Sequence, residues 1–195
     1  MRKLNPETTF YIDADKKGLN WKGWKEQYSL EKKNYISTSD PLSIKTLLNK
    51  INEDQTQIKT TIIDTLNGIM IDEEFRRMKE KNYDKWQDLA YSIYDIVCFS
   101  NTLREDLTII LVAHSQTERD DTGFYFTRVK TSGKKLDKIV IESKVSTVLL
   151  AKCVDGKYIF ETKNNNSTVK TPLGAFDTDT IENDITKVLE ALKDY

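Results

Sequence analysis

The sequence predicts an α/β fold with a mainly parallel sheet and helices on both faces. We interpret two segments, residues 58–64 (IKTTIID) and 107–113 (LTIILVA), as strands that are apolar almost throughout. Segments with apolar residues at helical spacing flank them, from Ile44 to Ile51 and from Trp86 to Val97. Strands that are apolar on both faces and alternate with amphipathic helices are typical of a parallel sheet covered on both sides.

The N-terminal half begins with a β-rich run, residues 8–13 (TTFYID), followed by an aromatic stretch that we interpret as an irregular connection. Asp40-Pro41 is typical of a helix start. The carboxylate accepts hydrogen bonds from amides without partners, and proline costs nothing at the first helical position. The apolar stripe of this helix contains Ile44, Leu47, Leu48 and Ile51. A further helix is predicted from Asp84, with Trp86, Leu89, Ile93, Ile96 and Val97 at helical spacing.

Beyond Gly133 the pattern predicts antiparallel structure. Residues 145–153 and 157–162 are β-rich and are separated by Asp155-Gly156, a strong hairpin signal. The last helix is predicted to place Ile181, Ile185, Val188, Leu189 and Leu192 on one face. Because the chain has 195 residues and no repeat or low-complexity linker, we expect a single domain over residues 1–195.

The overall composition indicates an ordinary globular protein. Hydrophobic residues make up 38%, and 30 basic residues nearly balance 31 acidic ones, so any DNA contact must come from a local patch. Cys98 and Cys153 lie far apart in apolar segments without CxxC spacing, which indicates buried thiols in a reducing compartment. No apolar run has the length of a membrane span or a signal peptide, so we expect a soluble, cytoplasmic protein.

Polar residues follow three of the predicted strands: Asp13 and Asp15, Asp64, and His114 with Gln116. Ligands of open α/β sheets bind at the carboxyl ends of the strands, so these side chains are candidates for a site. Asp64, after an apolar strand, fits a Walker B role, in which the carboxylate holds the water shell of Mg²⁺ bound to phosphates. The alternative is that Asp64 caps the following turn.

Two other strand-end residues also have alternative roles. Asp15 is placed where a general base orients water against a γ-phosphate, or it is a solvated acid in a turn. His114 is the only histidine, so histidine-based metal clusters are not expected. Its position lets it sense a phosphate through a hydrogen bond, and the alternative is a buried histidine with satisfied hydrogen bonds.

Residues 115–136 combine cations with aromatic rings. The cations are Arg119, Arg128, Lys130, Lys134 and Lys135, and the rings are Phe124, Tyr125 and Phe126. Cations for phosphates beside rings for bases favour single-stranded DNA binding. Glu118, Asp120 and Asp121 dilute this charge, and the aromatic run is also compatible with a strand packed on the core.

Taken together, FYIDAD, TTIIDTLNGIM, LTIILVAHSQ, KTSGKKL and ETKNNNSTVKTPLGAF resemble segments of RecA-type ATPases in the same order. They are most similar to the Sak group of phage proteins, the RecA-like single-strand annealing ATPases, over nearly the whole chain. The resemblance implies a RecA-like three-layer fold, binding of ATP and Mg²⁺, and a role in DNA recombination or annealing. For a phage-encoded protein it implies the host cytoplasm.

The resemblance also implies roles for individual residues. Asp15 matches the acid that polarises the attacking water, Asp64 the Walker B aspartate that holds Mg²⁺ through water, and His114 the γ-phosphate sensor. Thr65 and Gln116, at the same strand ends, are assigned to the nucleotide site. In a separate segment, Lys163 is similar to the basic residue that such proteins insert into the neighbouring subunit's nucleotide, which implies an oligomer.

The main departure from the family concerns the Walker A loop. The pattern G-x-x-x-x-G-K-[ST] does not occur, because Gly133-Lys134-Lys135 lacks the hydroxyl and the upstream glycine. In the family this loop, with its strand and helix, precedes the segment that matches residues 2–12. We therefore expect a truncated product, a late start codon or a divided reading frame. We also expect impaired hydrolysis and the loss of a central strand and helix, which would expose apolar sheet edges. Either another chain covers that surface or the fold has adapted.

Three functional hypotheses follow. The first is a phage-type recombination or annealing ATPase that binds single-stranded DNA and forms a homo-oligomer or assembles with a full-length ATPase or a single-strand binding protein. The second is a non-catalytic RecA-like module that binds partner subunits or single-stranded DNA. The third is an α/β domain whose strand-end acids only cap turns.

Overall fold

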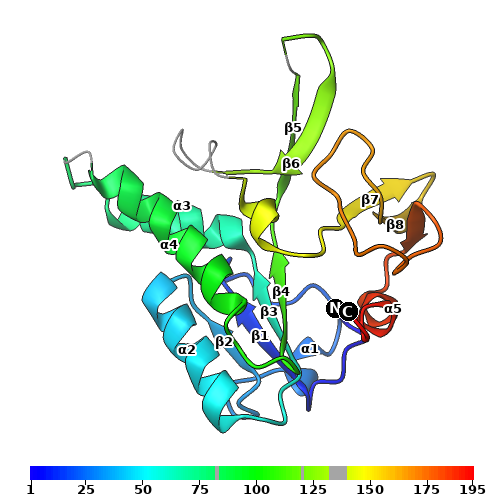
Figure 1. Cartoon of the computed structure of the whole chain (residues 1–195). Coiled ribbons are helices and arrows are strands. Elements are labelled where there is room, and N and C mark those ends of the chain that lie inside the picture. Colours follow the sequence, from blue (N-terminus) through cyan, green and yellow to red (C-terminus); the bar gives the residue numbers. More distant parts are fainter. Residues whose placement is uncertain (82–83, 120, 132–139) are drawn as a thin grey trace. The chain divides into compact units, whose positions relative to one another are not determined.

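A computed structural model describes residues 1–195 except 82–83, 120 and 132–139. The chain forms two compact units. The first, here called the sheet unit, comprises Asn5–His114 and Lys130–Ile141. The second, the hairpin unit, comprises Met1–Leu4, Ser115–Val129 and Glu142–Tyr195. Each unit has its own sheets (Figure 1).

The sheet unit contains a four-stranded parallel sheet in the order β2-β1-β3-β4. The strands are β1 (Thr9–Asp13), β2 (Tyr35–Ser37), β3 (Thr60–Asp64) and β4 (Thr108–Val112). The predicted α/β class with a parallel sheet is therefore confirmed. The prediction of an irregular connection after β1 is wrong at β2. This strand has no strong local signal and is defined by its pairing with β1.

The helices of this unit are α1 (Trp24–Gln27), α2 (Pro41–Asp54), α3 (Leu66–Arg76) and α4 (Asp84–Ser100). The predicted start of α2 is confirmed, since the Asp40 carboxylate accepts a hydrogen bond from the Ser43 amide at 2.7 Å. Helix α3 was not predicted. Helices α2 and α4 pack together, as do α3 and α4, on one side of the sheet, with α1 on the other (Figure 1).

Burial differs between the two apolar strands. The first four residues of β3 are buried, and Ile62 and Ile63 have no exposed surface. Strand β4 is half-buried or exposed throughout, because it pairs only with β3 among the described strands. The expectation that both strands are covered is therefore wrong for β4. The expectation of two buried thiols is also wrong, because Cys98 is half-buried and Cys153 is exposed.

The hairpin unit is antiparallel. Strands β5 (Ser115–Arg119) and β6 (Tyr125–Val129) form one hairpin, and β7 (Leu150–Val154), β8 (Lys157–Glu161) and β9 (Thr180–Glu182) form a second sheet. The predicted turn between β7 and β8 is confirmed, with positive φ angles of 50° at Asp155 and 75° at Gly156. A short 3-10 helix (Ile141–Lys144) precedes β7. The predicted strand therefore begins later than expected, at Leu150.

The C-terminal helix α5 (Ile185–Ala191) is shorter than predicted. Ile181 lies in β9 instead, where it pairs with Phe160. The helix begins where the Asp184 carboxylate accepts a hydrogen bond from the Thr186 amide at 3.1 Å. Thr180–Glu182 thus form a strand of the sheet before the helix starts. Separately, none of the described helices is long and apolar enough to cross a membrane.

Candidate functional site

The carboxyl ends of β1 and β3 bring three aspartates to one edge of the sheet unit. Asp13 and Asp64 are register partners in the parallel ladder, so they lie side by side. The Asp64 carbonyl accepts hydrogen bonds from the amides of Ala14 at 2.7 Å and Asp15 at 3.3 Å. These backbone contacts hold the loop after β1 against the end of β3, and we call Asp13, Asp15 and Asp64 the acidic edge.

Asp13 has a structural role within the acidic edge. It is almost completely buried, with 1% of its surface exposed. Its carboxylate accepts hydrogen bonds from the Tyr35 hydroxyl at 2.8 Å, the Gly18 amide at 2.7 Å and the Lys17 amide at 3.4 Å. Because its acceptor capacity is used by the protein, Asp13 fixes the loop of residues 14–18.

Asp15 is half-buried and makes two hydrogen bonds. Its Oδ1 accepts from the Thr65 hydroxyl at 2.8 Å, and its Oδ2 accepts from the Lys17 ammonium at 2.5 Å. Burial raises the pKa of Asp15, but hydrogen bonds from Lys17 and Thr65 outweigh it and leave the pKa below its ordinary value. Asp15 is therefore ionised at neutral pH. A freely solvated turn acid does not describe it.

Asp64 does not cap the helix that follows it, so that alternative is wrong. Thr65 is the N-cap of α3, and its hydroxyl accepts a hydrogen bond from the Gly68 amide at 3.1 Å. The Asp64 Oδ2 atom accepts a hydrogen bond from the Tyr11 hydroxyl instead. Burial and the Asp64 carboxylate raise the pKa of Tyr11, so the hydroxyl remains a proton donor.

The first turns of α3 pack closely against the loop after β1. A Cβ atom at Gly68 would lie 2.3 Å from Asp15 Oδ1 and 2.8 Å from the Ala14 carbonyl oxygen, so only glycine fits. One turn further, Asp72 pairs with the Lys16 ammonium at 2.5 Å. Sequence reasoning missed Gly68. The signal was a glycine inside a segment that later proves helical, which commonly marks close packing.

Asn67 is a second residue that sequence reasoning missed. It is buried, its Oδ1 accepts from the His114 amide at 2.7 Å, and its Nδ2 donates to the Lys130 carbonyl at 2.8 Å. The Lys130 amide in turn donates to the His114 carbonyl at 2.7 Å. Asn67 thus ties the start of α3 to the end of β4. The His114 residue is exposed, so the buried-histidine alternative is wrong.

The predicted DNA-contact residues lie mainly on the β5–β6 hairpin. Phe124, Tyr125 and Phe126 are 67%, 62% and 40% exposed, so the alternative that they pack on the core is wrong. The Arg119 guanidinium lies 5.9 Å from the centre of the Tyr125 ring. Arg128 pairs with Glu118 across the two strands at 3.0 Å.

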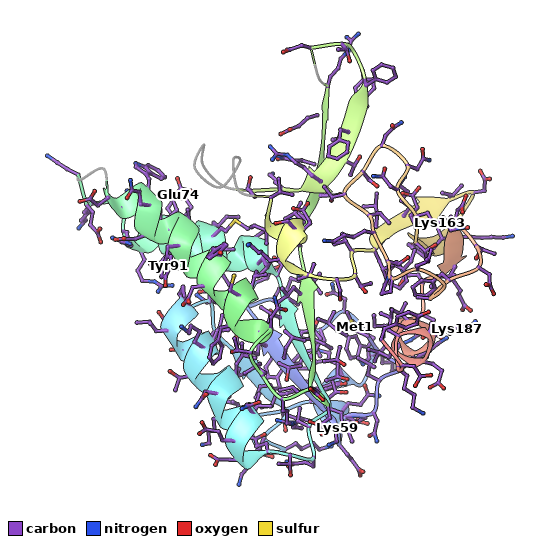
Figure 2. All side chains as sticks on the ribbon, in the orientation of Figure 1. Met1, Lys59, Glu74, Tyr91, Lys163 and Lys187 are labelled. Carbon is purple, nitrogen blue, oxygen red and sulfur yellow. The ribbon has the colours of Figure 1, made fainter. Side chains whose placement is uncertain are left out.

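The remaining predicted residues lie in other places. Gln116 belongs to β5 of the hairpin unit, where its Nε2 donates to Glu118 at 2.7 Å. Lys163 follows β8 in the same unit and pairs with Asp179 at 2.9 Å (Figure 2). Lys130 is exposed and directly follows β6, as the first residue of the second segment of the sheet unit. Lys134 and Lys135 fall outside the described residues.

The acidic edge fits only an indirect role in holding a metal ion. Over the described ranges, no three His, Cys, Asp or Glu residues are grouped so that they could ligate a metal. Mg²⁺ in nucleotide sites keeps several waters and needs only one or two carboxylates. Asp64 fits this requirement, because the contact with Tyr11 involves only its Oδ2 atom.

Comparison of the chain with protein-family models, with curated proteins and with solved structures gives no match. The fold class is thus established by the strand order and register alone. A proposal for the function therefore depends on the geometry of the acidic edge and on the order of the sequence segments.

Proposed function

We propose that this chain is a RecA-like protein of phage-type DNA recombination or single-strand annealing, with its nucleotide site at the acidic edge. The observation that carries this proposal is the junction of β1 and β3. There Asp13 and Asp64 are register partners, and Thr65 donates a hydrogen bond to Asp15. Two acids with different surroundings at adjacent strand ends are the arrangement expected for water activation beside a phosphate–metal group.

Asp64 and Asp15 have different roles in this proposal. Asp64, supported by Tyr11, holds the water shell of Mg²⁺, which supplies charge neutralisation at the phosphates when it is bound. Asp15 orients the attacking water. Its lowered pKa keeps it ionised, and its contacts with Thr65 and Lys17 fix its position. His114, exposed just after β4, senses the γ-phosphate.

Single-stranded DNA is the proposed partner of the β5–β6 hairpin. Exposed rings at Phe124 and Tyr125 offer stacking surfaces for bases, and Arg119 lies beside the second ring. Lys163 serves a neighbouring subunit in this proposal, which requires release of its ion pair with Asp179. The active site is then complete only in an oligomer.

A non-catalytic interaction module is the second candidate. The sequence contains no G-x-x-x-x-G-K-[ST] loop, so the amides and lysine that usually cradle phosphates are not in this chain. Ile71, Phe75 and Met78 form an exposed apolar stripe on and after α3, at 46%, 69% and 63% exposure. Such a stripe is typical of a surface that binds another protein.

Titration with a fluorescent ATP analogue tests the nucleotide site. We expect saturable binding that requires Mg²⁺ and weakens at least tenfold in Asp64→Asn, which retains an acceptor for Tyr11 but loses the charge. Asp54→Asn, an exposed acid at the end of α2, is the matched control and should bind as the wild type does. Absence of saturable binding at millimolar nucleotide would rule out an autonomous site and leave the interaction module.

DNA binding is tested separately, by the fluorescence anisotropy of a labelled oligothymidylate. Replacing both Phe124 and Tyr125 with Ala removes two stacking surfaces, so the affinity should fall by about tenfold or more. Tyr158→Ala removes an equally exposed ring from β8 and should leave the affinity unchanged. Equal losses in the two variants would argue against a site on the β5–β6 hairpin.

A further inference from the structure

A basin of about 700 Å³ lies at the amino ends of the strands in the sheet unit. Glu7 precedes β1, Lys33 precedes β2, Gln57 precedes β3, and Lys50 and Gln55 come from the end of α2. We call it the amino-end basin. Because the strands are parallel, it lies at the opposite end of the sheet from the acidic edge. Five residues of strand separate the two ends by about 16 Å.

The amino-end basin is electropositive. Three lysines line it, Lys32, Lys33 and Lys50, against a single carboxylate, Glu7. Neither Lys33 nor Lys50 makes an ion pair with any part of the chain that the structure describes. The Lys32 ammonium donates to the carbonyl of Glu26, which carries no net charge, so the charge of Lys32 is not neutralised. Lysines held near one another without counter-charges repel, and an anion between them removes that repulsion.

The carbonyl end of α2 does not cancel this charge. The last carbonyls of a helix carry partial negative charge, which would disfavour an anion nearby. Here the Arg104 guanidinium donates hydrogen bonds to the carbonyls of Ile51 at 2.8 Å and Asn52 at 3.1 Å, and further bonds to those of Gln55 and Ile58. Arg104 therefore satisfies the carbonyls at the helix end by hydrogen bonds, and it also pairs with Asp106 at 2.9 Å. The lysines of the basin take part in none of these contacts.

One wall of the basin is fixed in place by a buried asparagine. Asn34 is 5% exposed, and its Nδ2 donates to the carbonyls of Pro6 and Gln27, each at 2.9 Å. Its Oδ1 accepts from the Ser29 amide at 3.0 Å. These bonds hold the turn that carries Lys32 and Lys33, so little conformational entropy is lost at the backbone when a ligand binds.

We propose that the amino-end basin binds a small phosphorylated ligand, with its phosphate among Lys32, Lys33 and Lys50. The proposal uses no residue of the acidic edge or of the β5–β6 hairpin. Its test is therefore independent of the function proposed above.

The test is a titration followed by amide chemical shifts of the isotope-labelled full chain. The probes are ribose 5-phosphate, inorganic phosphate and ribose. We expect ribose 5-phosphate and inorganic phosphate to give saturable shifts at Lys33 and Gln57, and ribose to give none. Lys33→Gln with Lys50→Gln should weaken ribose 5-phosphate at least tenfold. The control is Lys22→Gln with Lys79→Gln, which removes two exposed lysines outside the basin.

Ribose that binds as tightly as ribose 5-phosphate would overturn the phosphate as the group that the basin recognises. Absence of saturable shifts at millimolar probe would overturn the site. A short oligothymidylate that shifts the same amides when ribose 5-phosphate does not would assign the basin to nucleic acid and also overturn the proposal.

Discussion

The two compact units bury different kinds of side chain. In the sheet unit the fully buried residues are mostly large and apolar, such as Ile12, Ile44, Ile62 and Ile93. Among the described residues of the hairpin unit, the buried apolar set is limited to Leu4, Val169, Ile185 and Val188. Buried polar residues outnumber them there, namely Glu142, Glu161, Thr162, Ser167 and Asp184. The sheet unit is thus stabilised by apolar burial, and the hairpin unit depends more on specific hydrogen bonds and ion pairs.

The largest expected effect is in the centre of the sheet unit. Ile62→Ala should lower the free energy of unfolding by about 2–5 kcal/mol, because Ile62 has no exposed surface. Ile110→Ala, at the register partner in the half-buried strand β4, should cost about 1–2 kcal/mol. Urea unfolding followed by circular dichroism measures both. Equal losses would show that β4 is covered by another chain in solution.

The next largest effect is expected from disturbing the close packing at the acidic edge. Gly68→Ala places a methyl group against Asp15 and the Ala14 carbonyl, so we expect a loss of about 1–3 kcal/mol in urea unfolding. Gly156→Ala is the comparison in the hairpin unit. Its Cβ would meet nothing within 4 Å, so it costs only the left-handed backbone penalty, about 1 kcal/mol. A smaller loss at Gly68 would contradict the tight contact.

A buried carboxylate in the hairpin unit tests whether hydrogen bonds stabilise that unit. Glu142 Oε1 accepts from the Val129 amide at 2.7 Å and the Thr168 hydroxyl at 2.9 Å. Glu142→Ala leaves both donors without this partner and should cost about 1–3 kcal/mol by urea unfolding. Glu142→Gln keeps an oxygen at the same position and should cost clearly less. Equal costs would show that the charge, rather than the hydrogen bonds, is what matters.

The smallest expected effect is a pH dependence at α5. Lys3 pairs with Asp184 at 2.5 Å, and its hydrogen bond, with that of Thr186, lowers the pKa of Asp184 from 3.8 to about 2. The ionised carboxylate therefore stabilises the folded state above pH 3.8, and this contribution is lost as the pH falls toward about 2. Asp184→Asn should melt below the wild type at pH 7, with the difference shrinking across that interval. Asp177→Asn, at an exposed position in the same unit, should show no such change.

Elements with strong local signals were predicted well. Helices α2 and α4 have clear apolar spacing, and β3 contains β-branched residues throughout before Asp64. Helix α3 escaped prediction because Gly68 interrupts it and Ile71 and Phe75 point to solvent, which removes the usual stripe. Strands β2 and β9 have three residues each and are defined by their neighbours. Such short segments carry little propensity of their own.

The candidate site was predictable only in outline. The acids at the ends of β1 and β3 were named from their positions after apolar strands, and parallel register places Asp13 beside Asp64. The supporting residues Tyr11, Asn67 and Gly68 were not named, because their partners lie tens of residues away in sequence. Gln116 was grouped with His114 by sequence proximity, although the chain passes from one unit to the other between them.

By itself the sequence determined the α/β class, the start of α2 at Asp40 and the turn at Asp155-Gly156. These features depend on backbone geometry and hydrogen bonds within a few residues, so local patterns specify them. Only the tertiary structure decided that β4 is half-exposed, that Thr65 rather than Asp64 caps α3, and that lysines gather at the amino ends of the strands. Burial and charge clustering depend on which distant segments become neighbours, and no local pattern encodes that choice.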